Sequence, residues 1–209
     1  SGPVGSGVVR GGPGHAAALA EIARRYATSH GPVSAEDLAR WTTLPKREAV
    51  RALEDAVEET RAADYGVDAA SARVPLVRAV VEGGARGGLR VLGVGERVPS
   101  AGLLYLRADL LELLDAGLGR ARAARFLPSF DELHVGYKDR SCLTDASGER
   151  LICPSSNGMF RPLLVDRGRL VGVRPVGEGV LWLGGSAPSA RVERDTARAV
   201  AAVEKRLAR

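Results

Sequence analysis

Residues 34–61 read SAEDLARWTTLPKREAVRALEDAVEETR, and this stretch decides the first half of the fold. Ser34 and Asp37 are three residues apart, a shortened form of the capping box that predicts a helix beginning just after Ser34. Residues 42–44 predict a tight turn, and Pro45 suits the first position of the next helix because proline has no N–H to lose there. Two helices joined by a short turn indicate a helix-turn-helix.

Apolar residues at helical spacing predict which side of each helix is buried. Residues 15–28, HAAALAEIARRYAT, form a further helix upstream, so the unit has three helices with a short turn before the third. The residues expected to be buried are Leu19, Ile22 and Tyr26 in the first helix, Leu38 and Trp41 in the second, and Val50, Leu53 and Val57 in the third.

The charge of the third helix is uneven along its length. Its first half carries Lys46, Arg47 and Arg51, and its second half carries Glu54, Asp55, Glu58 and Glu59. A recognition helix contacts DNA mainly through its N-terminal residues, which favours a DNA-binding interpretation. The alternative is a solvated helix face with i,i+4 ion pairs, such as Arg51 with Asp55.

Extended segments are expected after the three helices. Residues 89–97 and 103–107 are two apolar runs around VPSAG, which predicts a β-hairpin where the wing of a winged helix would lie. Residues 61–88 are less regular and resemble an insertion: 73–83 fit a strand or a short helix, and the Gly-rich tail fits a loop. Residues 108–119 predict a short amphipathic helix that ends at Gly117 or Gly119.

From Arg125 onward the pattern becomes extended. The segments predicted to be strands are 125–137, 149–153, 158–175 and 179–185, and the clearest hairpin is LLV-DRGR-LVGV. Residues 189–207 predict a closing helix with Val192, Ala199, Val203 and Leu207 near one side, and its mixed charges predict a solvated face.

The expected fold class is therefore α+β: a winged helix-turn-helix followed by a small β-rich C-terminal unit closed by a helix. Residues 1–14 are expected to be a linker or a remnant of cloning. The winged helix is expected at 15–120, with its insertion at 61–88, and the β-rich unit at 121–209.

Composition narrows the class of protein. The chain has 209 residues, of which 45% are hydrophobic and 26% are charged, as in ordinary soluble globular proteins. No apolar run reaches the roughly 18 residues that a membrane span needs, and no signal peptide is recognisable, so a cytoplasmic location is expected. The net charge of +5 fits nucleic-acid binding, although Arg-rich usage also follows from a GC-rich genome.

Motifs for several chemistries are missing from the sequence. There is no phosphate-binding loop of nucleotide enzymes and no nucleophile elbow of hydrolases. His15, His30, His134, Cys142 and Cys153 match no zinc template, so no metal and no cofactor are expected. Asp131 and Glu132 would point to opposite faces of a strand, which argues against a catalytic carboxylate pair acting on a glycosidic bond.

Three stretches together resemble a known family. Residues 24–55 resemble the middle helix-turn-helix of the AlkZ/YcaQ-like winged-helix DNA glycosylases. Residues 126–141, FLPSFDELHVGYKDRS, resemble the characteristic C-terminal segment of that family, and residues 157–175 resemble the hairpin that follows. Order and spacing agree, apart from the longer 61–88 region. The resemblance implies tandem winged-helix units that grip duplex DNA and, in characterised relatives, hydrolysis of the N-glycosidic bond of alkylated or crosslinked bases.

The family's catalytic motif is Gln-apolar-Gln or Gln-apolar-Asp, supplied by a more N-terminal part. This sequence has no Gln, and Asn157 is its one Asn. We therefore expect either the C-terminal portion of a longer enzyme or a short homologue without glycosylase machinery. No catalytic residue is assigned, and the chain by itself is not expected to be an enzyme.

The leading hypothesis is a module that binds double-stranded DNA, the duplex-binding portion of a repair glycosylase. The expected DNA-contacting residues are Lys46, Arg47, Arg51, Tyr137, Lys138 and Arg140. Leu127, Phe130 and Leu133 are expected to anchor a strand, while Asp131, Asp139 and Arg140 hold a turn. The alternatives are an active glycosylase and, given the acidic second half of the third helix, a protein–protein surface. The sequence leaves the oligomeric state open.

Overall fold

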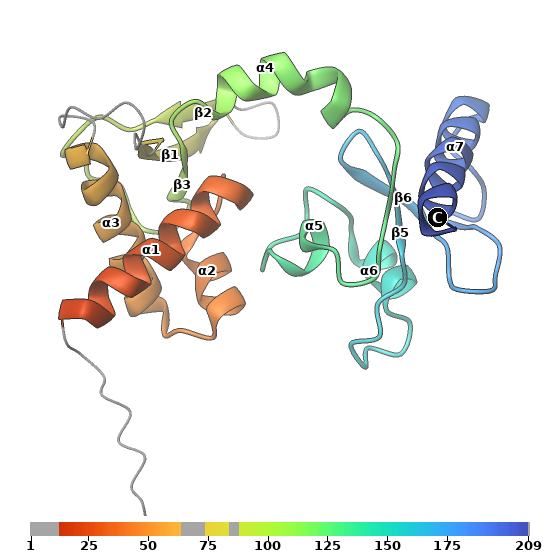
Figure 1. The fold of residues 1–209 in the computed structure, drawn as a ribbon, viewed down its shortest axis with the longest axis horizontal. Helices are drawn as coiled ribbons and strands as arrows, with labels where there is room; N and C mark the ends of the chain where they lie inside the picture. Colours follow the sequence, from red (N-terminus) through yellow and green to blue (C-terminus); the bar gives the residue numbers. More distant parts are fainter. Residues whose placement is uncertain (1–12, 64–73, 84–87, 209) are drawn as a thin grey trace, which may run out of the picture. The chain divides into compact units, whose positions relative to one another are not determined.

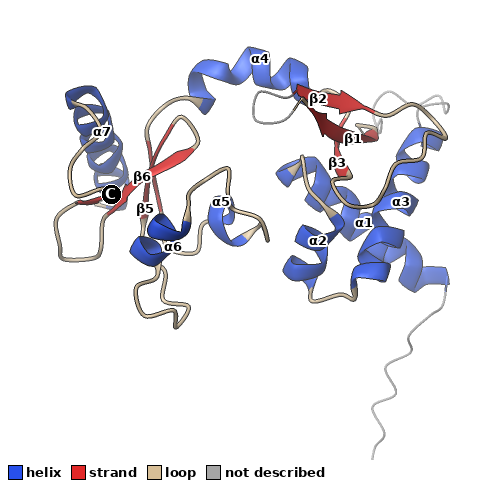
Figure 2. Ribbon diagram, turned by 180° about the vertical axis from the view of Figure 1, so that it is seen from behind, coloured by secondary structure: helices blue, strands red, loops and turns tan. Residues whose placement is uncertain are grey.

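The structure, a computed structural model, describes residues 13–63, 74–83 and 88–208. The chain divides into two compact units, Ser1–Leu110 and Leu111–Arg209. Each unit combines helices with its own antiparallel sheet, so the expected α+β class is confirmed (Figure 1, Figure 2). Most of the expected linker at 1–14, and residues 64–73 and 84–87 of the expected insertion, lie outside the described residues.

Unit 1 opens with three helices: α1 (Pro13–His30), α2 (Ala35–Thr42) and α3 (Lys46–Ala63). The Ser34 hydroxyl accepts a hydrogen bond from the Asp37 N–H at 3.1 Å, and the Asp37 carboxylate accepts one from the Ser34 N–H at 2.8 Å. The predicted capping box is therefore confirmed. Pro45 lies one residue before α3, and its carbonyl accepts the first helical bond, from the Ala49 N–H at 3.1 Å.

Small residues form the contact between α1 and α3. The fully or almost fully buried positions include Ala20, Ala23, Tyr26 and Ala27 in α1, and Ala49, Ala52, Leu53 and Ala56 in α3. The expected burial of Ile22 and Trp41 is wrong, because these side chains are 39% and 44% exposed. Alanine lets two helices approach closely, so larger side chains beside the contact remain at its margin.

The sheet of unit 1 has the order β2-β1-β3, with β1 (Leu76–Glu82), β2 (Gly88–Val91) and β3 (Leu104–Arg107). The expected hairpin between 89–97 and 103–107 is wrong, because β2 and β3 both pair antiparallel with β1. The buried Thr60 hydroxyl on α3 accepts a hydrogen bond from the Leu76 N–H at 3.0 Å, which fixes the start of β1. The region expected to be an insertion therefore supplies the central strand.

Helix α4 (Leu110–Ala121) has no buried residue. It continues past both Gly117 and Gly119, so the expected end point is wrong. A glycine inside a helix costs only about 1 kcal/mol relative to alanine, which is too little to end a helix by itself.

Unit 2 contains a sheet of order β4-β5-β6-β7, with β4 (Arg125–Leu127), β5 (Leu163–Asp166), β6 (Arg169–Val173) and β7 (Leu181–Trp182). The β5–β6 hairpin confirms the clearest strand prediction. Helix α7 (Ala190–Leu207) confirms the closing helix and buries Val192, Thr196 and Val200, whereas Leu207 is exposed.

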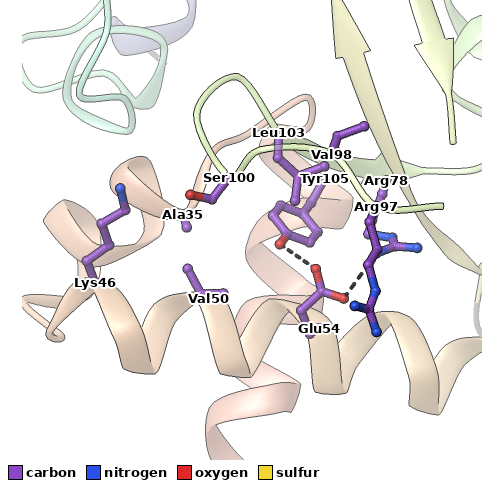
Figure 3. A pocket seen from close by; sticks show the side chains of 10 residues that line it. All are labelled: Ala35, Lys46, Val50, Glu54, Arg78, Arg97, Val98, Ser100, Leu103 and Tyr105. Carbon is purple, nitrogen blue, oxygen red and sulfur yellow. Dashed lines mark hydrogen bonds and ion pairs between the residues drawn. The ribbon is translucent and has the colours of Figure 1, made fainter. Parts of the chain in front are cut away.

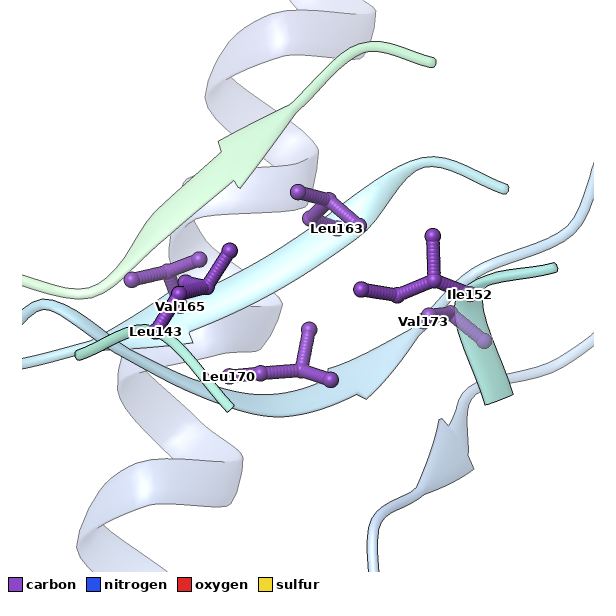
Figure 4. Packing of buried hydrophobic residues seen from close by; sticks show 6 residues of the cluster. All are labelled: Leu143, Ile152, Leu163, Val165, Leu170 and Val173. Carbon is purple, nitrogen blue, oxygen red and sulfur yellow. The ribbon is translucent and has the colours of Figure 1, made fainter. Parts of the chain in front are cut away.

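Both faces of the β5–β6 hairpin are covered. One face packs in a cluster with residues of α6 (Ala146–Ile152), formed by Leu143, Ile152, Leu163, Val165, Leu170 and Val173 (Figure 4). The other face packs on α7 through Leu164, Val171, Val192 and Val200. The register shifts between Leu164 and Val165, and such a bulge lets Leu170 and Val173, three residues apart, share one face.

Two segments expected to be strands contain helical residues, so those predictions hold only for the three residues of β4. Residues 125–137 contain only the short β4 and then α5 (Glu132–Val135), and residues 149–153 end α6. Asp131 accepts from the Leu133 N–H at 2.9 Å, and Asp145 accepts from the Gly148 N–H at 3.0 Å. These N-caps satisfy the donors that open a helix, and so decide the local structure.

The side chains expected to anchor a strand behave differently from one another. Leu127 packs partly buried against the cluster of Figure 4. Phe130 and Leu133 are 54% and 38% exposed, so their expected anchoring role is wrong. The residue that enters the interior here is His134, because the helical turn after Asp131 rotates it inward.

Candidate nucleic-acid interface

The three cations predicted on α3 are all exposed. Arg47 and Arg51 lie on the side of α3 opposite its packed face, which runs from Ala49 to Ala56, whereas Lys46 lies beside α2. The Lys46 amine pairs with the Glu36 carboxylate on α2. Arg47 and Arg51 make no ion pair within the part of the chain that the structure describes, and the alternative Arg51–Asp55 pair is not formed there.

Side chains farther along α3 hold the helix against the sheet. The Tyr105 hydroxyl donates to Glu54 at 2.7 Å, and the Arg78 guanidinium lies 3.8 Å from the same carboxylate (Figure 3). Burial first, and then the hydrogen bond to Glu54, raises the pKa of the Tyr105 phenol. The hydroxyl therefore keeps its proton and remains a donor, so α3 is tied to β1 and β3.

A cavity of about 280 Å³ lies beside α3, between this helix and the segment that leads to β3 (Figure 3). Lys46, Val50 and Glu54 line it from the helix side, and Arg78 and Arg97 line it from the other. Its three cations outnumber its one carboxylate, so the charge of α3 continues along the cavity wall.

In residues 130–141, in contrast to the exposed arginines of α3, a charged side chain makes contacts inside the protein. The Arg140 guanidinium donates to the His134 carbonyl at 2.7 Å and to the Glu149 carboxylate at 3.2 Å. The buried His134 ring lies 3.0 Å from the same carboxylate through Nε2. Tyr137 is half-buried and Lys138 is exposed. Of the predicted site residues in this segment, Arg140 is therefore held by internal contacts and Lys138 faces solvent.

The expected turn residues each make a local contact. Asp139 accepts from the Ser141 N–H at 2.8 Å, and this bond, followed by the Ser141 hydroxyl, lowers the pKa of the Asp139 carboxyl. Asp131 caps α5. The Arg140 guanidinium forms an ion pair with Glu149 of α6. The predicted turn is therefore held by Asp139, whereas Asp131 begins a helix and Arg140 links His134 to Glu149.

Sequence reasoning missed two features of unit 2. Glu149 contacts both His134 and Arg140. The sequence pattern predicts a strand at residues 149–153, and a strand there gives no reason to expect these contacts. The second feature is a group of arginines from α7 and the β5–β6 turn around one hollow. Mixed signs along residues 189–207 indicated only a solvated face, and one sequence offers no signal for arginines brought together from distant segments.

Neither a cluster of metal-binding side chains nor a membrane-spanning helix occurs among the described residues. That part of the chain contains no group of three or more His, Cys, Asp or Glu side chains able to hold a metal ion. None of its helices is long and apolar enough to cross a membrane. The cytoplasmic location expected from the sequence stays a prediction.

Comparisons with known proteins agree on one family. The family model described as DNA glycosylase AlkZ-like matches residues 4–209. The structure is similar to that of Streptomyces sahachiroi DNA glycosylase AlkZ, with a TM-score of 0.57 and 20% identity over 90% of this chain and 43% of that chain. Curated proteins give no match. Because the family model covers almost the whole sequence, the chain belongs to the AlkZ-like DNA glycosylase family, as residues 24–55, 126–141 and 157–175 suggested.

Proposed function

We propose that this chain binds duplex DNA, with unit 1 as a winged-helix unit and α3 as its recognition helix. The observation that carries the proposal is the exposed face of α3, where Arg47 and Arg51 lie without ion pairs among the described residues. Membership of a DNA glycosylase family supports a DNA ligand and a role in DNA repair.

The order of elements supports a winged helix. Helix α2, a turn at Thr43 and helix α3 are followed by the antiparallel pair β1–β2, which takes the place of the wing. In such units the amino-terminal part of the second helix of the turn motif enters the major groove. We extend this assignment to residues 15–120, with residues 121–209 as the second domain.

We propose further contacts to DNA from residues 137–140. The exposed Lys138 supplies a contact to phosphate, and Tyr137 beside it supplies a contact to the DNA backbone. The contacts of Arg140 with His134 and Glu149 make it the residue that positions this segment for both.

The interaction expected of Arg47 and Arg51 is electrostatic. Guanidinium groups that neutralise phosphates release condensed counterions. Each contact therefore increases the dependence of the binding constant on salt concentration. An ion pair already formed in the protein would have to break first, and neither arginine has one among the described residues.

The test is a fluorescence anisotropy titration of a short labelled duplex at several salt concentrations. Arg47→Ala combined with Arg51→Ala is expected to weaken binding about tenfold or more, and to reduce the slope of log K against log salt by about two. Lys205→Ala with Arg206→Ala is the control, because it removes two exposed charges from the end of α7. Equal behaviour of the two double variants would reject α3 as the contact.

Base excision is the second candidate function, and family membership favours it. The chain spans 43% of the similar Streptomyces glycosylase, so we propose this activity for the whole protein rather than for these residues alone. Asn157 carries the one carboxamide of the sequence, and its oxygen accepts from the Met159 N–H at 3.1 Å. That bond keeps it in a local turn and leaves it poorly placed to orient a water molecule.

A base-release assay on alkylated and crosslinked duplexes separates the two functions. We expect the 209-residue chain to bind these duplexes and to release no base. Release of a base that survives Asn157→Ala would show that another residue supplies the chemistry. Release that Asn157→Ala abolishes would contradict the turn-forming role of Asn157.

A further inference from the structure

Unit 2 contains an open hollow of about 420 Å³ lined by four arginines from separate segments. Arg191 and Arg198 come from α7, Arg167 from the turn between β5 and β6, and Arg122 from the residues after α4. Helix α7 packs against β4 and β5 (Figure 1), which brings these segments together. The four arginines come from three separate segments, so the sequence of any one segment does not predict that they lie together.

Arg191 is held in place by a buried carboxylate. Its guanidinium donates to Asp166 at 2.7 Å and 3.1 Å, through Nη2 and Nη1, and Asp166 is buried at the end of β5. Such a two-point contact fixes the plane of a guanidinium and leaves its remaining donors available to a ligand.

Asp195 is the one acidic residue of the lining, and cations surround it. Its carboxylate lies 3.3 Å from Arg191 and 3.7 Å from Arg198. Outside the lining, Arg194 lies 3.7 Å from the same carboxylate. With Asp166 counted as well, the four arginines of the lining face two carboxylates, which leaves an excess of positive charge in the hollow.

The other two arginines have no anionic partner. Arg122 and Arg167 are exposed, and neither forms an ion pair within the residues that the structure describes. The rest of the lining consists of small residues, Gly119, Ala123, Ala124 and Ala199. Small side chains let a bulky anion reach the guanidinium groups.

We propose that this hollow binds phosphate groups of the DNA backbone, as a second contact of the chain besides α3. The inference rests on the proposed duplex binding and adds a named site on unit 2. Guanidinium groups match the geometry of phosphate oxygens. The hollow is open and has no aromatic side chain in its lining, which suits a continuous backbone better than an enclosed nucleotide.

The test uses the full chain and the same labelled duplex. Arg122→Ala with Arg167→Asn removes the two unpaired cations; asparagine is chosen because Arg167 has a φ of 52°, a conformation that asparagine tolerates. We expect duplex affinity to fall about tenfold and the salt slope to decrease by about two. Thermal unfolding should match that of the wild type, since neither side chain makes an ion pair among the described residues.

The Lys205→Ala and Arg206→Ala variant is again the matched control, since it removes the same charge from another part of unit 2. A hollow variant that binds like this control would overturn the site. If wild type binds the duplex and only the α3 variant is impaired, duplex binding stands and the hollow is rejected. If wild type does not bind, both proposals fail together.

Inorganic phosphate distinguishes a backbone site from a site for a free anion. We expect phosphate to bind weakly and to compete with the duplex in wild type but much less in the hollow variant. Tight phosphate binding at the hollow that leaves duplex affinity unchanged would contradict a DNA contact and assign the site to a small anion.

Discussion

Helix α3 and residues 130–141 both carry cations suggested for DNA binding, and the contacts of those cations differ. Arg47 and Arg51 on α3 lie exposed and without ion pairs among the described residues. Arg140 is tied to His134 and Glu149 inside unit 2. Since an arginine engaged in a buried network must give up those bonds to reach a ligand, exposure and pairing indicate function better than charge alone.

The contrast between α3 and residues 130–141 depends on the helical structure of residues 130–152. Ile152→Ala removes a fully buried side chain of α6 and should lower the free energy of unfolding of unit 2 by about 2–5 kcal/mol. Leu133→Ala should cost much less, because Leu133 is partly exposed on α5. Urea unfolding in a Trp41→Phe background measures both, since Trp182 then reports unit 2 alone. A larger loss for Leu133→Ala would favour the strand expected from the sequence.

A smaller effect is expected for Arg140→Ala. The His134 carbonyl and the Glu149 carboxylate lose their donor, which should destabilise unit 2 by about 2 kcal/mol. The exposed Arg150→Ala is the control, with the same Trp182 signal. Unchanged stability together with a large loss of duplex affinity would show that Arg140 serves DNA rather than the fold.

The presentation of α3 depends on the helix before it. Ser34→Ala removes the capping box of α2 and should cost unit 1 about 1 kcal/mol. Trp41 in α2 reports this loss when Trp182 is replaced by Phe. Ser155→Ala, at an exposed loop position of unit 2, should change nothing in this signal. An equal response to both variants would mean that the cap does not stabilise the turn before α3.

The smallest expected effect is a change in the pH dependence of stability. The Asp139 pKa is lower in the folded chain than its ordinary value. The ionised carboxylate therefore stabilises the fold at pH values above that ordinary pKa. The contribution disappears as pH falls through the folded pKa. Asp139→Asn should therefore lower the thermal midpoint slightly at neutral pH, with the difference from wild type vanishing as pH falls below the ordinary carboxyl pKa of about 4. A difference that persists in acid would exclude this carboxylate as its source.

The helices of unit 1 could be predicted from sequence because their signals are local. The Ser34–Asp37 cap and the turn before Pro45 lie within a few residues of the bonds they make. The β5–β6 hairpin is likewise contained in residues 163–173. The pairing of β1 with both β2 and β3 depends on residues farther apart, and apolar pattern alone does not specify a partner.

The residues of the candidate site also differ in whether the sequence could predict them. Arg47 and Arg51 could be found from sequence because helical spacing places them opposite the apolar face of α3. The partner of Arg140 could not, because Glu149 comes from α6, and the short apolar run at residues 151–153 fits a strand as well as a helix. The arginine hollow of unit 2 depends on three segments meeting, which only the packed structure supplies.

Hydrogen–deuterium exchange of the chain, with and without saturating duplex, tests the central claim most directly. The first N–H groups of an α-helix have no partner four residues earlier, so we expect those of Lys46 and Arg47 to exchange readily in the free chain. We expect duplex binding to slow exchange at residues 43–48, and the effect to disappear in the Arg47→Ala and Arg51→Ala variant. Protection that is confined to residues 130–141, with residues 43–48 unchanged by bound duplex, would contradict the account.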